Sequence, residues 1–527
     1  MKKLLSALLI LSTSNFISGC PTANVVSPSS SPVGAYASRD MAMSTPIMPA
    51  EGLKLDDSVA KKNTEEYAKI VDNAFLEVSK NPLSTFSIDV DTAAYSNIRR
   101  FIENKQTPPK DAARIEEMIN YFTYDYPQPT GNNPFSINME MSDAPWNKDH
   151  KLISIGLQGK KIDKNNLPPS NLVFLIDTSG SMSGSMEMLK DSFRLLVNQL
   201  REEDRVSIVA YAGSAGLVLE STPGNNKDKI LKSIDGLQSG GSTAGGEGIN
   251  LAYKVAKDNF IANGNNRVIL ATDGDFNVGV SSDNDLVKLI EEKRDQGTFL
   301  SVLGFGKGNY KDSKMEQLAD KGNGNYAYID GIKEAKKVFV DQIGGTILPI
   351  AKDVKLQLEF NPTKVKSYRL IGYENRLLKN EDFNNDKKDA GELGAGTSVT
   401  ALYEIISADF SGVDKLKYKQ TPAQTEVLGS DEVMTVKFRY KDPKETESKL
   451  LSQVLKDNKM SFDQTSDNFR FAASVAGFGM LLRDSEYKGN VNITNITDMA
   501  KNSKGKDTEG YRTEFINLLN LYSSVKK

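Results

Sequence analysis

Oxygen-bearing side chains recur at three points in the middle of the chain, each next to an apolar run or a helical pattern. Asp177, Ser179 and Ser181 are spaced by two residues, so a turn after residue 177 can direct their oxygens to one point. Thr243 lies in a Gly-rich stretch, and Asp273 begins the pair Asp-Gly after another apolar run. Three hydroxyls and two carboxylates form an all-oxygen ligand set that suits Mg²⁺ or Mn²⁺, with Ca²⁺ also possible. We therefore predict a hard-cation site built from these five residues.

The remaining composition excludes several other kinds of chemistry. The 527 residues contain one cysteine, Cys20, and one histidine, His150. Disulfides and CxxC metal sites need at least two thiols, and a Ser-His-Asp or Cys-His centre has to use His150. Lys and Arg number 66 against 69 Asp and Glu, a net charge of −3 that does not indicate nucleic acid as a partner.

The segment from 165 to 347 alternates short apolar runs with amphipathic helical patterns. The expected strands are 171–176, 206–211, 268–271, 299–305 and 326–329, and the expected helices are 186–200, 226–237, 245–260, 284–295, 314–321 and 332–342. Continuous apolar strands between helices indicate a doubly wound α/β domain, with a mostly parallel sheet covered on both faces. Ligands bind at the carboxyl ends of strands in such sheets. Four of the five oxygen-bearing residues follow an expected strand, and Thr243 lies just before the expected helix 245–260.

The regions on either side of this domain have a mixed α and β pattern. In the N-terminal region, 56–150, we expect helices at 56–79, 93–103 and 111–122 and strands at 85–90 and 135–142. A further strand is expected directly after it, at 151–158. In the C-terminal region, 348–527, we expect strands at 354–360, 365–373, 398–406 and 433–440 and helices near 464–484, 494–501 and 508–523. Antiparallel strands followed by helices suggest that the C-terminal region is a separate α+β unit.

The five oxygen-bearing residues resemble the metal-ion-dependent adhesion site (MIDAS) of von Willebrand factor type A (vWA) domains. That pattern is DxSxS, a distant Thr and an Asp in a TDG turn, and Asp177, Ser179, Ser181, Thr243 and Asp273 match it. The resemblance implies a Rossmann-like fold with the site at the carboxyl edge of the sheet. It also implies that the bound cation takes an acidic side chain of a protein partner as its last ligand.

The resemblance extends to almost the whole chain after its leader. NPLSTFSIDVDTAAYSNIRRFI, DAARIEEMINYFTYDYP and APWN look like the N-terminal region of a family of bacterial vWA lipoproteins. GYENRLL and FRFAASVAGFGMLLR look like the C-terminal region of that family. This resemblance implies the architecture more firmly than it implies a ligand.

The first 55 residues have the features of a secretion leader and a tether. Two lysines precede the apolar run 4–11, as in a signal peptide, and ISGC at 17–20 resembles the bacterial lipobox. The resemblance implies that 1–19 is removed and that Cys20 is acylated, with palmitate as one such acyl group. Residues 20–55 are rich in Pro, Ser and Ala and should stay disordered. We expect a lipid-anchored protein of the cell membrane or outer membrane.

Two weaker motifs suggest other roles. Asp89, Asp91 and Thr92 match the DxDxT nucleophile motif of haloacid-dehalogenase-like phosphatases, but they follow one isolated strand far from the α/β domain. We favour a helix cap with a neighbouring surface carboxylate. Residues 382–386 begin like a calcium loop, but Lys387 replaces the required Gly, so we favour a polar hairpin loop and leave a loose cation site open.

These observations lead to one expected function and two alternatives. We expect a membrane-tethered binding protein of the cell envelope, not an enzyme, that captures a carboxylate of a protein partner through the MIDAS cation. The first alternative is a Mg²⁺-dependent envelope hydrolase or phosphatase that uses Asp89 and Asp91 or the vWA metal. The second is a vWA accessory factor in the assembly of an envelope complex, although a lipobox argues against direct contact with a cytosolic ATPase. The oligomeric state is left open.

Overall fold

The computed structural model describes residues 65–243, 245–274, 283–307, 310–409 and 430–525. The expected signal peptide (1–19), the tether (20–55) and Cys20 lie outside the described residues. None of the helices in the described ranges has the length and apolar character that crossing a membrane requires.

The middle of the chain forms a six-stranded sheet with the strand order β10-β9-β8-β5-β6-β7. Its strands are β5 (Ser170–Asp177), β6 (Arg205–Tyr211), β7 (Ala215–Pro223), β8 (Asn265–Thr272), β9 (Thr298–Gly304) and β10 (Tyr326–Tyr328). All neighbouring pairs are parallel except β6 and β7. The antiparallel edge strand β7 is the one strand of this sheet that we did not predict.

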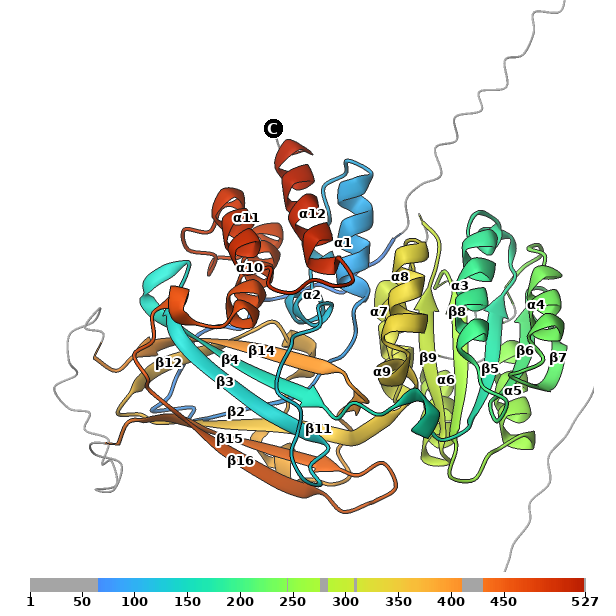
Figure 1. The fold of residues 1–527 in the computed structure, drawn as a ribbon, viewed down its shortest axis with the longest axis horizontal. Helices are drawn as coiled ribbons and strands as arrows, with labels where there is room; N and C mark the ends of the chain where they lie inside the picture. Colours follow the sequence, from blue (N-terminus) through green and yellow to red (C-terminus); the bar gives the residue numbers. More distant parts are fainter. Residues whose placement is uncertain (1–64, 244, 275–282, 308–309, 410–429, 526–527) are drawn as a thin grey trace, which may run out of the picture. The chain divides into compact units, whose positions relative to one another are not determined.

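Helices cover both faces of this sheet (Figure 1). They are α3 (Met186–Gln199), α4 (Lys227–Asp235), α5 (Gly245–Asp258), α6 (Asp283–Asp295), α7 (Asp312–Lys321) and α8 (Ile332–Lys336), followed by a π-helical turn (Lys337–Asp341) and α9 (Ile343–Ile347). Along β5, Leu172, Phe174 and Ile176 pack in the core under α3, α4 and α8, whereas Val173 and Leu175 pack in the core under α5, α6 and α7. This two-sided burial confirms the predicted doubly wound α/β fold.

The flanking regions form two antiparallel sheets that share one core. The first sheet has the order β1-β12-β14-β4-β3, and the second has the order β13-β11-β15-β16 with β2 paired to β11. The strands are β1 (Leu76–Glu77), β2 (Leu83–Ser87), β3 (Phe135–Ala144), β4 (Asn147–Gly159), β11 (Pro349–Phe360), β12 (Val365–Ile371), β13 (Gly391–Gly394), β14 (Ser398–Ser407), β15 (Glu432–Lys441) and β16 (Lys449–Lys456). Inward-facing residues of both sheets form a single apolar cluster, so together they make a β-sandwich.

The expectation of a separate C-terminal α+β unit is wrong. β4, from before the α/β domain, pairs with β14, from after it, over the register Gln158↔Ser398 to His150↔Ile406. β2 pairs with β11 in the same way. The α/β domain is therefore an insertion between two halves of one sandwich. The pattern of each half cannot reveal this pairing, because a strand carries no local signal for a partner more than 200 residues away.

Helices from both ends of the chain pack together on the sandwich (Figure 1). They are α1 (Ala93–Glu103), α2 (Ile115–Asn120), α10 (Asp467–Arg483), α11 (Ile493–Asn502) and α12 (Tyr511–Val525), and their buried residues form one cluster. α10 contains the apolar run 471–482, which is a buried helix.

The helix expected at 56–79 is absent from the described part of that range. Residues 65–75 form no helix, and the short strand β1 follows them. The polar groups of this segment bond to distant parts of the chain: Ile70 N donates to Asp111 Oδ1 (2.9 Å), and the Asn73 amide donates to two carbonyls at the end of β12 and just after it (3.2 and 2.9 Å). These tertiary hydrogen bonds outweigh the local helical spacing.

Three buried arginines fasten the α/β domain to the flanking region. The ion pairs of these arginines that cross between the two parts are Arg99 with Asp330 and Glu334, Arg114 with Asp312 and Glu316, and Arg376 with Glu316 and Asp320. Each arginine side chain is at most 11% exposed. A guanidinium has five donors in a planar array and can bridge several carboxylates at once, so removing one arginine leaves several buried charges without their partner.

Replacing Arg99 by Met should destabilise the protein strongly, because Asp330 and Glu334 would stay buried without their cation. A loss of about 3–5 kcal/mol is typical for a broken buried ion pair. Urea unfolding followed by circular dichroism measures it. Arg194 is the matched control, since its pairs with Asp191 and Asp235 are exposed, and Arg194→Met should cost less than about 1 kcal/mol. Equal unfolding midpoints for the two variants would contradict the anchoring role of Arg99.

Candidate metal centre

Three segments of the α/β domain meet at the carboxyl end of its sheet. β5 ends at Asp177 and the adjacent parallel strand β8 ends at Thr272, whose hydroxyl donates a 3.0 Å hydrogen bond to Asp177 Oδ2. The Gly-rich loop before α5 is joined to the loop after β5 by backbone hydrogen bonds, one of them from Gly180 N to Gly241 O (3.1 Å). The parallel arrangement therefore brings together segments that are far apart in the sequence.

The loop after β5 holds three of the predicted ligands in direct contact. Ser179 N donates to Asp177 Oδ1 (2.9 Å), which folds the chain back over the carboxylate. The hydroxyls of Ser179 and Ser181 lie 3.0 Å apart and share a hydrogen bond. Asp177 and Ser179 are buried, and Ser181 is exposed. The two hydroxyls thus lie side by side, on a loop that the Asp177 carboxylate braces through its backbone.

Asp273 directly follows β8 and is also buried. The glycine after it adopts a positive φ of 92°, and a Cβ there would lie 2.8 Å from the backbone nitrogen of Lys311. Gly306, with φ of 89°, passes so close that its Cβ would lie 3.2 Å from Asp273 Cβ. The TDG turn therefore requires its glycine, because a side chain would collide with the start of α7.

The electrostatics of this edge favour a bound cation. Burial raises the pKa of the Asp177 carboxyl and the charge of Asp273 raises it further, while hydrogen bonds from Ser179 and Thr272 act in the opposite direction. A divalent cation between the two carboxylates would offset both their desolvation and their mutual repulsion. The donor set of two carboxylates and neighbouring hydroxyls fits a hard cation such as Mg²⁺. No set of three or more His, Cys, Asp or Glu side chains within the described ranges could hold a metal ion, so a metal here needs the hydroxyls.

Thr243 lies on the Gly-rich loop directly before α5 and is half-buried. The backbone bonds of this loop hold it against the loop that carries Ser179 and Ser181. The structure therefore joins Asp177, Ser179 and Ser181 by direct hydrogen bonds, places Asp273 within electrostatic range of Asp177, and keeps Thr243 on the adjacent loop.

Sequence reasoning did not identify Thr272 as part of this centre. Its hydroxyl donates to Asp177 Oδ2 and accepts from Gly274 N (3.1 Å), so it links the two carboxylate-bearing turns. The sequence signal for Thr272 was present, since Thr272 is the first residue of the TDG triplet that contains Asp273.

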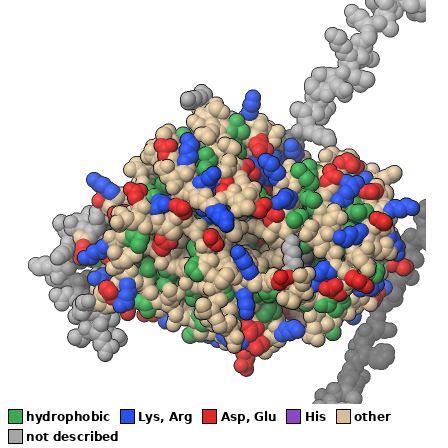
Figure 2. Space-filling model, viewed as in Figure 1, with side chains coloured by type: hydrophobic (Ala, Val, Ile, Leu, Met, Phe, Trp, Pro, Cys, Tyr) green, Lys and Arg blue, Asp and Glu red, His purple; other side chains and the backbone are tan. Residues whose placement is uncertain are grey.

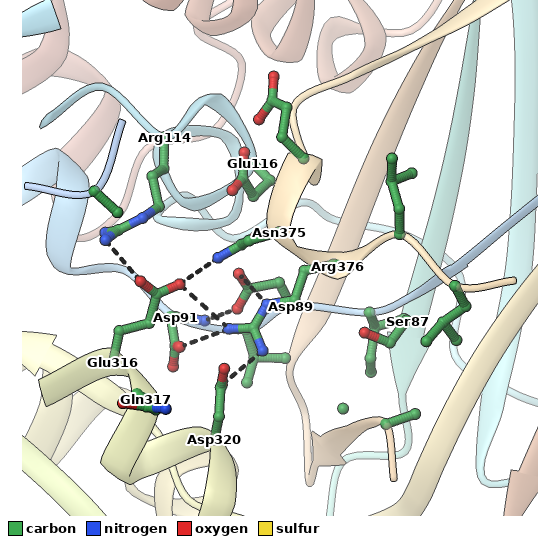
Figure 3. Close-up of a pocket in the computed structure, with 18 of the residues that line it drawn as sticks. Ser87, Asp89, Asp91, Arg114, Glu116, Glu316, Gln317, Asp320, Asn375 and Arg376 are labelled. Carbon is green, nitrogen blue, oxygen red and sulfur yellow. Dashed lines mark hydrogen bonds and ion pairs between the residues drawn. The ribbon is translucent and has the colours of Figure 1, made fainter. Parts of the chain in front are cut away.

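Asp89 and Asp91 are neither a helix cap nor surface carboxylates, and that expectation is wrong. Both are buried, and both pair with Arg376 (3.1 and 3.2 Å; Figure 3). Asp91 Oδ1 also accepts from Tyr326 N at 2.7 Å, and Thr92 precedes α1 without a side-chain capping bond. The two carboxylates serve the junction between the α/β domain and the flanking region, which the local motif could not indicate.

The loop that begins like a calcium site has its carbonyls occupied by lysines. Lys355 Nζ donates to Asn385 O (2.6 Å), and Lys441 Nζ donates to Asp386 O (2.6 Å). The Asp386 carboxylate, which a calcium loop would use, is engaged as well, since its Oδ1 accepts from Arg439 Nε (3.2 Å) and Ser448 Oγ (2.6 Å). These contacts favour a polar loop over a cation site. The expected hairpin is wrong, because the segment connects β12 of one sheet to β13 of the other.

Comparisons with known proteins match all three parts of the chain. Family models match at residues 61–154 (von Willebrand factor), 171–339 (von Willebrand factor type A domain) and 345–525 (Uncharacterized protein YfbK, C-terminal). The chain is 42% identical over 477 residues to Uncharacterized protein YfbK of Escherichia coli (strain K12), covering 89% of this chain and 82% of that protein.

Two further similarities concern smaller or more distant matches. Uncharacterized protein sll0103 of Synechocystis sp. is 31% identical over 202 residues, which cover 37% of this chain and 46% of that protein. Among solved structures, von Willebrand factor type A from Catenulispora acidiphila is 15% identical and matches 75% of this chain and 92% of that one with a TM-score of 0.40. The identity and coverage of the first relative, together with the three family models, show that the chain belongs to the YfbK family of bacterial proteins that contain a vWA domain.

Proposed function

We propose that the protein is a binding protein of the cell envelope, whose vWA domain captures an acidic group of a protein partner through a divalent cation. The observation that carries the proposal is the direct contact of Asp177, Ser179 and Ser181 at the carboxyl edge of the sheet, with Asp273 buried beside them. Mg²⁺ is the proposed cation, with Mn²⁺ or Ca²⁺ as alternatives.

The residues of the chain prepare this site in three ways. Ser179, Ser181 and Thr243 would contribute neutral hydroxyls, while Asp177 and Asp273 would contribute the negative charge. Hydrogen bonds from Ser179 N and Thr272 hold the Asp177 carboxylate in one orientation. When bound, the cation would supply an electrophilic position for a partner carboxylate. With the neutral hydroxyls coordinating directly and the carboxylates acting through water, the cation would keep most of its positive charge for the partner.

We also propose that the protein acts by binding and not by catalysis. The other Mg²⁺-type motif of the chain is Asp89 and Asp91, and Arg376 engages both carboxylates. A nucleophilic aspartate needs a free oxygen beside a metal, whereas these two oxygens face a guanidinium. This pairing disfavours the phosphatase alternative.

The proposal includes attachment to the membrane through an acylated Cys20. The lipobox-like sequence ISGC and the Pro- and Ser-rich stretch after it support this part. A tether of about 35 residues would let the folded region reach on the order of 30 Å from the lipid surface.

Metal binding should depend on Asp177 and Ser181 but not on Ser183. Calorimetric titration with Mn²⁺ should give no binding for Asp177→Asn and at least about ten-fold weaker binding for Ser181→Ala, since each removes a proposed donor. Ser183 lies in the same loop, and its hydroxyl donates to the local carbonyl of Gly180, so Ser183→Ala should bind like the wild type. Unchanged Mn²⁺ binding by Asp177→Asn would refute the metal site.

Partner capture should follow the metal. The wild-type protein should retain its partner from envelope extracts in the presence of Mg²⁺ and should lose it in EDTA. The Asp177→Asn variant should fail to retain the partner even with Mg²⁺. Quantitative mass spectrometry of the retained proteins measures this. A partner that remains bound both in EDTA and to Asp177→Asn would show that binding does not use the cation.

Membrane attachment should depend on Cys20. Replacing Cys20 by Ser should abolish incorporation of labelled palmitate and move the protein from the membrane fraction to the soluble fraction. Immunoblotting of both fractions gives the result, and Ser18→Ala serves as a control because a small residue is kept there. Membrane association that survives Cys20→Ser would exclude the proposed lipid anchor.

A further inference from the structure

A cavity of about 760 Å³ lies where α7 of the α/β domain meets the loop after β2 and the short 3₁₀ helix Glu374–Arg376 (Figure 3). None of the five proposed metal ligands lines it. A volume of this size falls in the range of small-molecule sites. The cavity is therefore distinct in its residues from the metal centre.

The wall of this cavity has an excess of negative charge. Eight carboxylates and five cationic side chains line it. Arg114 and Arg376 are outnumbered by the carboxylates with which they pair. Lys69 and Lys388 are exposed, and Lys321 pairs with Glu291, which is not part of the wall. Outside the wall, Arg483 pairs with Glu374 and Arg294 pairs with Asp389. Glu116 and Glu392 are therefore the wall carboxylates for which the described residues provide no ion pair.

Two carboxylate oxygens of the wall are buried without a hydrogen-bond partner among the described residues. They are Glu116 Oε2 and Glu392 Oε1. Glu116 is only 1% exposed, and Figure 3 shows its side chain in the cavity wall above Asn375 and Arg376. Burial, with Glu374 as the next cause, raises the pKa of Glu116 to about 7. A buried carboxylate oxygen without a donor is costly, so both atoms indicate a missing cationic or hydrogen-bonding ligand.

These two carboxylates belong to different parts of the wall. Glu116 lies on α2, where its side chain packs against Gly372 just after β12. Glu392 lies on β13, which pairs with β11 in the other sheet. Because different elements carry the two carboxylates, a ligand that pairs with both needs more than one positive group.

Apolar side chains at the same cavity are exposed to solvent. Val71 is 70% exposed and Leu377 is 49% exposed, and both line the cavity. A metal ion would gain nothing from them, and the described residues contain no cluster of three carboxylates or imidazoles that converges on one point. An aliphatic chain, by contrast, would cover part of this apolar surface.

We propose that this cavity binds an aliphatic diamine or polyamine, whose ammonium groups pair with Glu116 and Glu392 and whose methylene chain lies against Val71 and Leu377. The ammonium groups provide the missing donors, and the chain between them spans the two acidic parts of the wall. The site uses no residue of the metal centre and does not depend on the proposed function.

Calorimetric titration of the purified full-length protein with putrescine and spermidine, in EDTA, tests this site. Both should bind, and n-butylamine, which has one ammonium group, should bind at least about ten-fold more weakly because one charged hydrogen bond is lost. Glu116→Gln and Glu392→Gln should each weaken putrescine binding by about ten-fold or more. Both substitutions keep the shape of the side chain and remove a desolvated charge, so the variants should fold, as circular dichroism will verify.

Glu381→Gln is the control, because Glu381 is exposed and does not line the cavity; it should bind putrescine like the wild type. The site is refuted if putrescine and spermidine give no heat of binding at millimolar concentration. Equal affinities of Glu116→Gln, Glu392→Gln and Glu381→Gln for putrescine would refute it as well, since binding would then be a general effect of surface charge.

Discussion

Two carboxylates, Asp177 and Asp273, lie buried at the ends of adjacent parallel strands, and the rest of the proposed centre depends on keeping them there. Burial of two like charges is unfavourable unless hydrogen bonds or a cation compensate them. The chain supplies some compensation through Ser179 N and the Thr272 hydroxyl, which both donate to Asp177. A bound cation would complete it, and the same hydrogen bonds would hold the ligands ready before the metal arrives.

The flanking sandwich supports the α/β domain at both of its connections. Since β4 precedes that domain and β11 follows it, and both strands belong to the sandwich, both connections begin at one shared core. Arg99, Arg114 and Arg376 then fix the sides of the domain by buried ion pairs. The junction that results is rich in carboxylates. In its cavity the carboxylates are dispersed and lie beside apolar surface, whereas in the proposed metal centre the oxygen ligands would converge on one point.

Local sequence patterns predicted the features that depend on neighbouring residues, namely individual strands and helices and the spacing of the proposed metal ligands. Apolar runs such as the one in 171–176 identified the strands of the doubly wound sheet, and the range 93–103 matches α1 at both ends. The spacing of residues 177, 179 and 181 anticipated their contact. Features that depend on distant pairing were missed. The shared sandwich has no local signal, the segment 65–75 follows tertiary hydrogen bonds in place of its helical spacing, and Asp89 and Asp91 pair with Arg376, more than 280 residues away. The sequence alone cannot distinguish a buried carboxylate at such a junction from one at the surface, because the distant residue with which it pairs is not known.

The most direct test of the metal centre is the position of the cation itself. Crystals of the protein grown with Mn²⁺ should show an anomalous-scattering peak in contact with the hydroxyls of Ser179 and Ser181 and next to the Asp177 and Asp273 carboxylates. A fully loaded crystal with no peak at this edge, or with Mn²⁺ bound only elsewhere, would contradict the assignment of a cation-dependent binding site to the vWA domain.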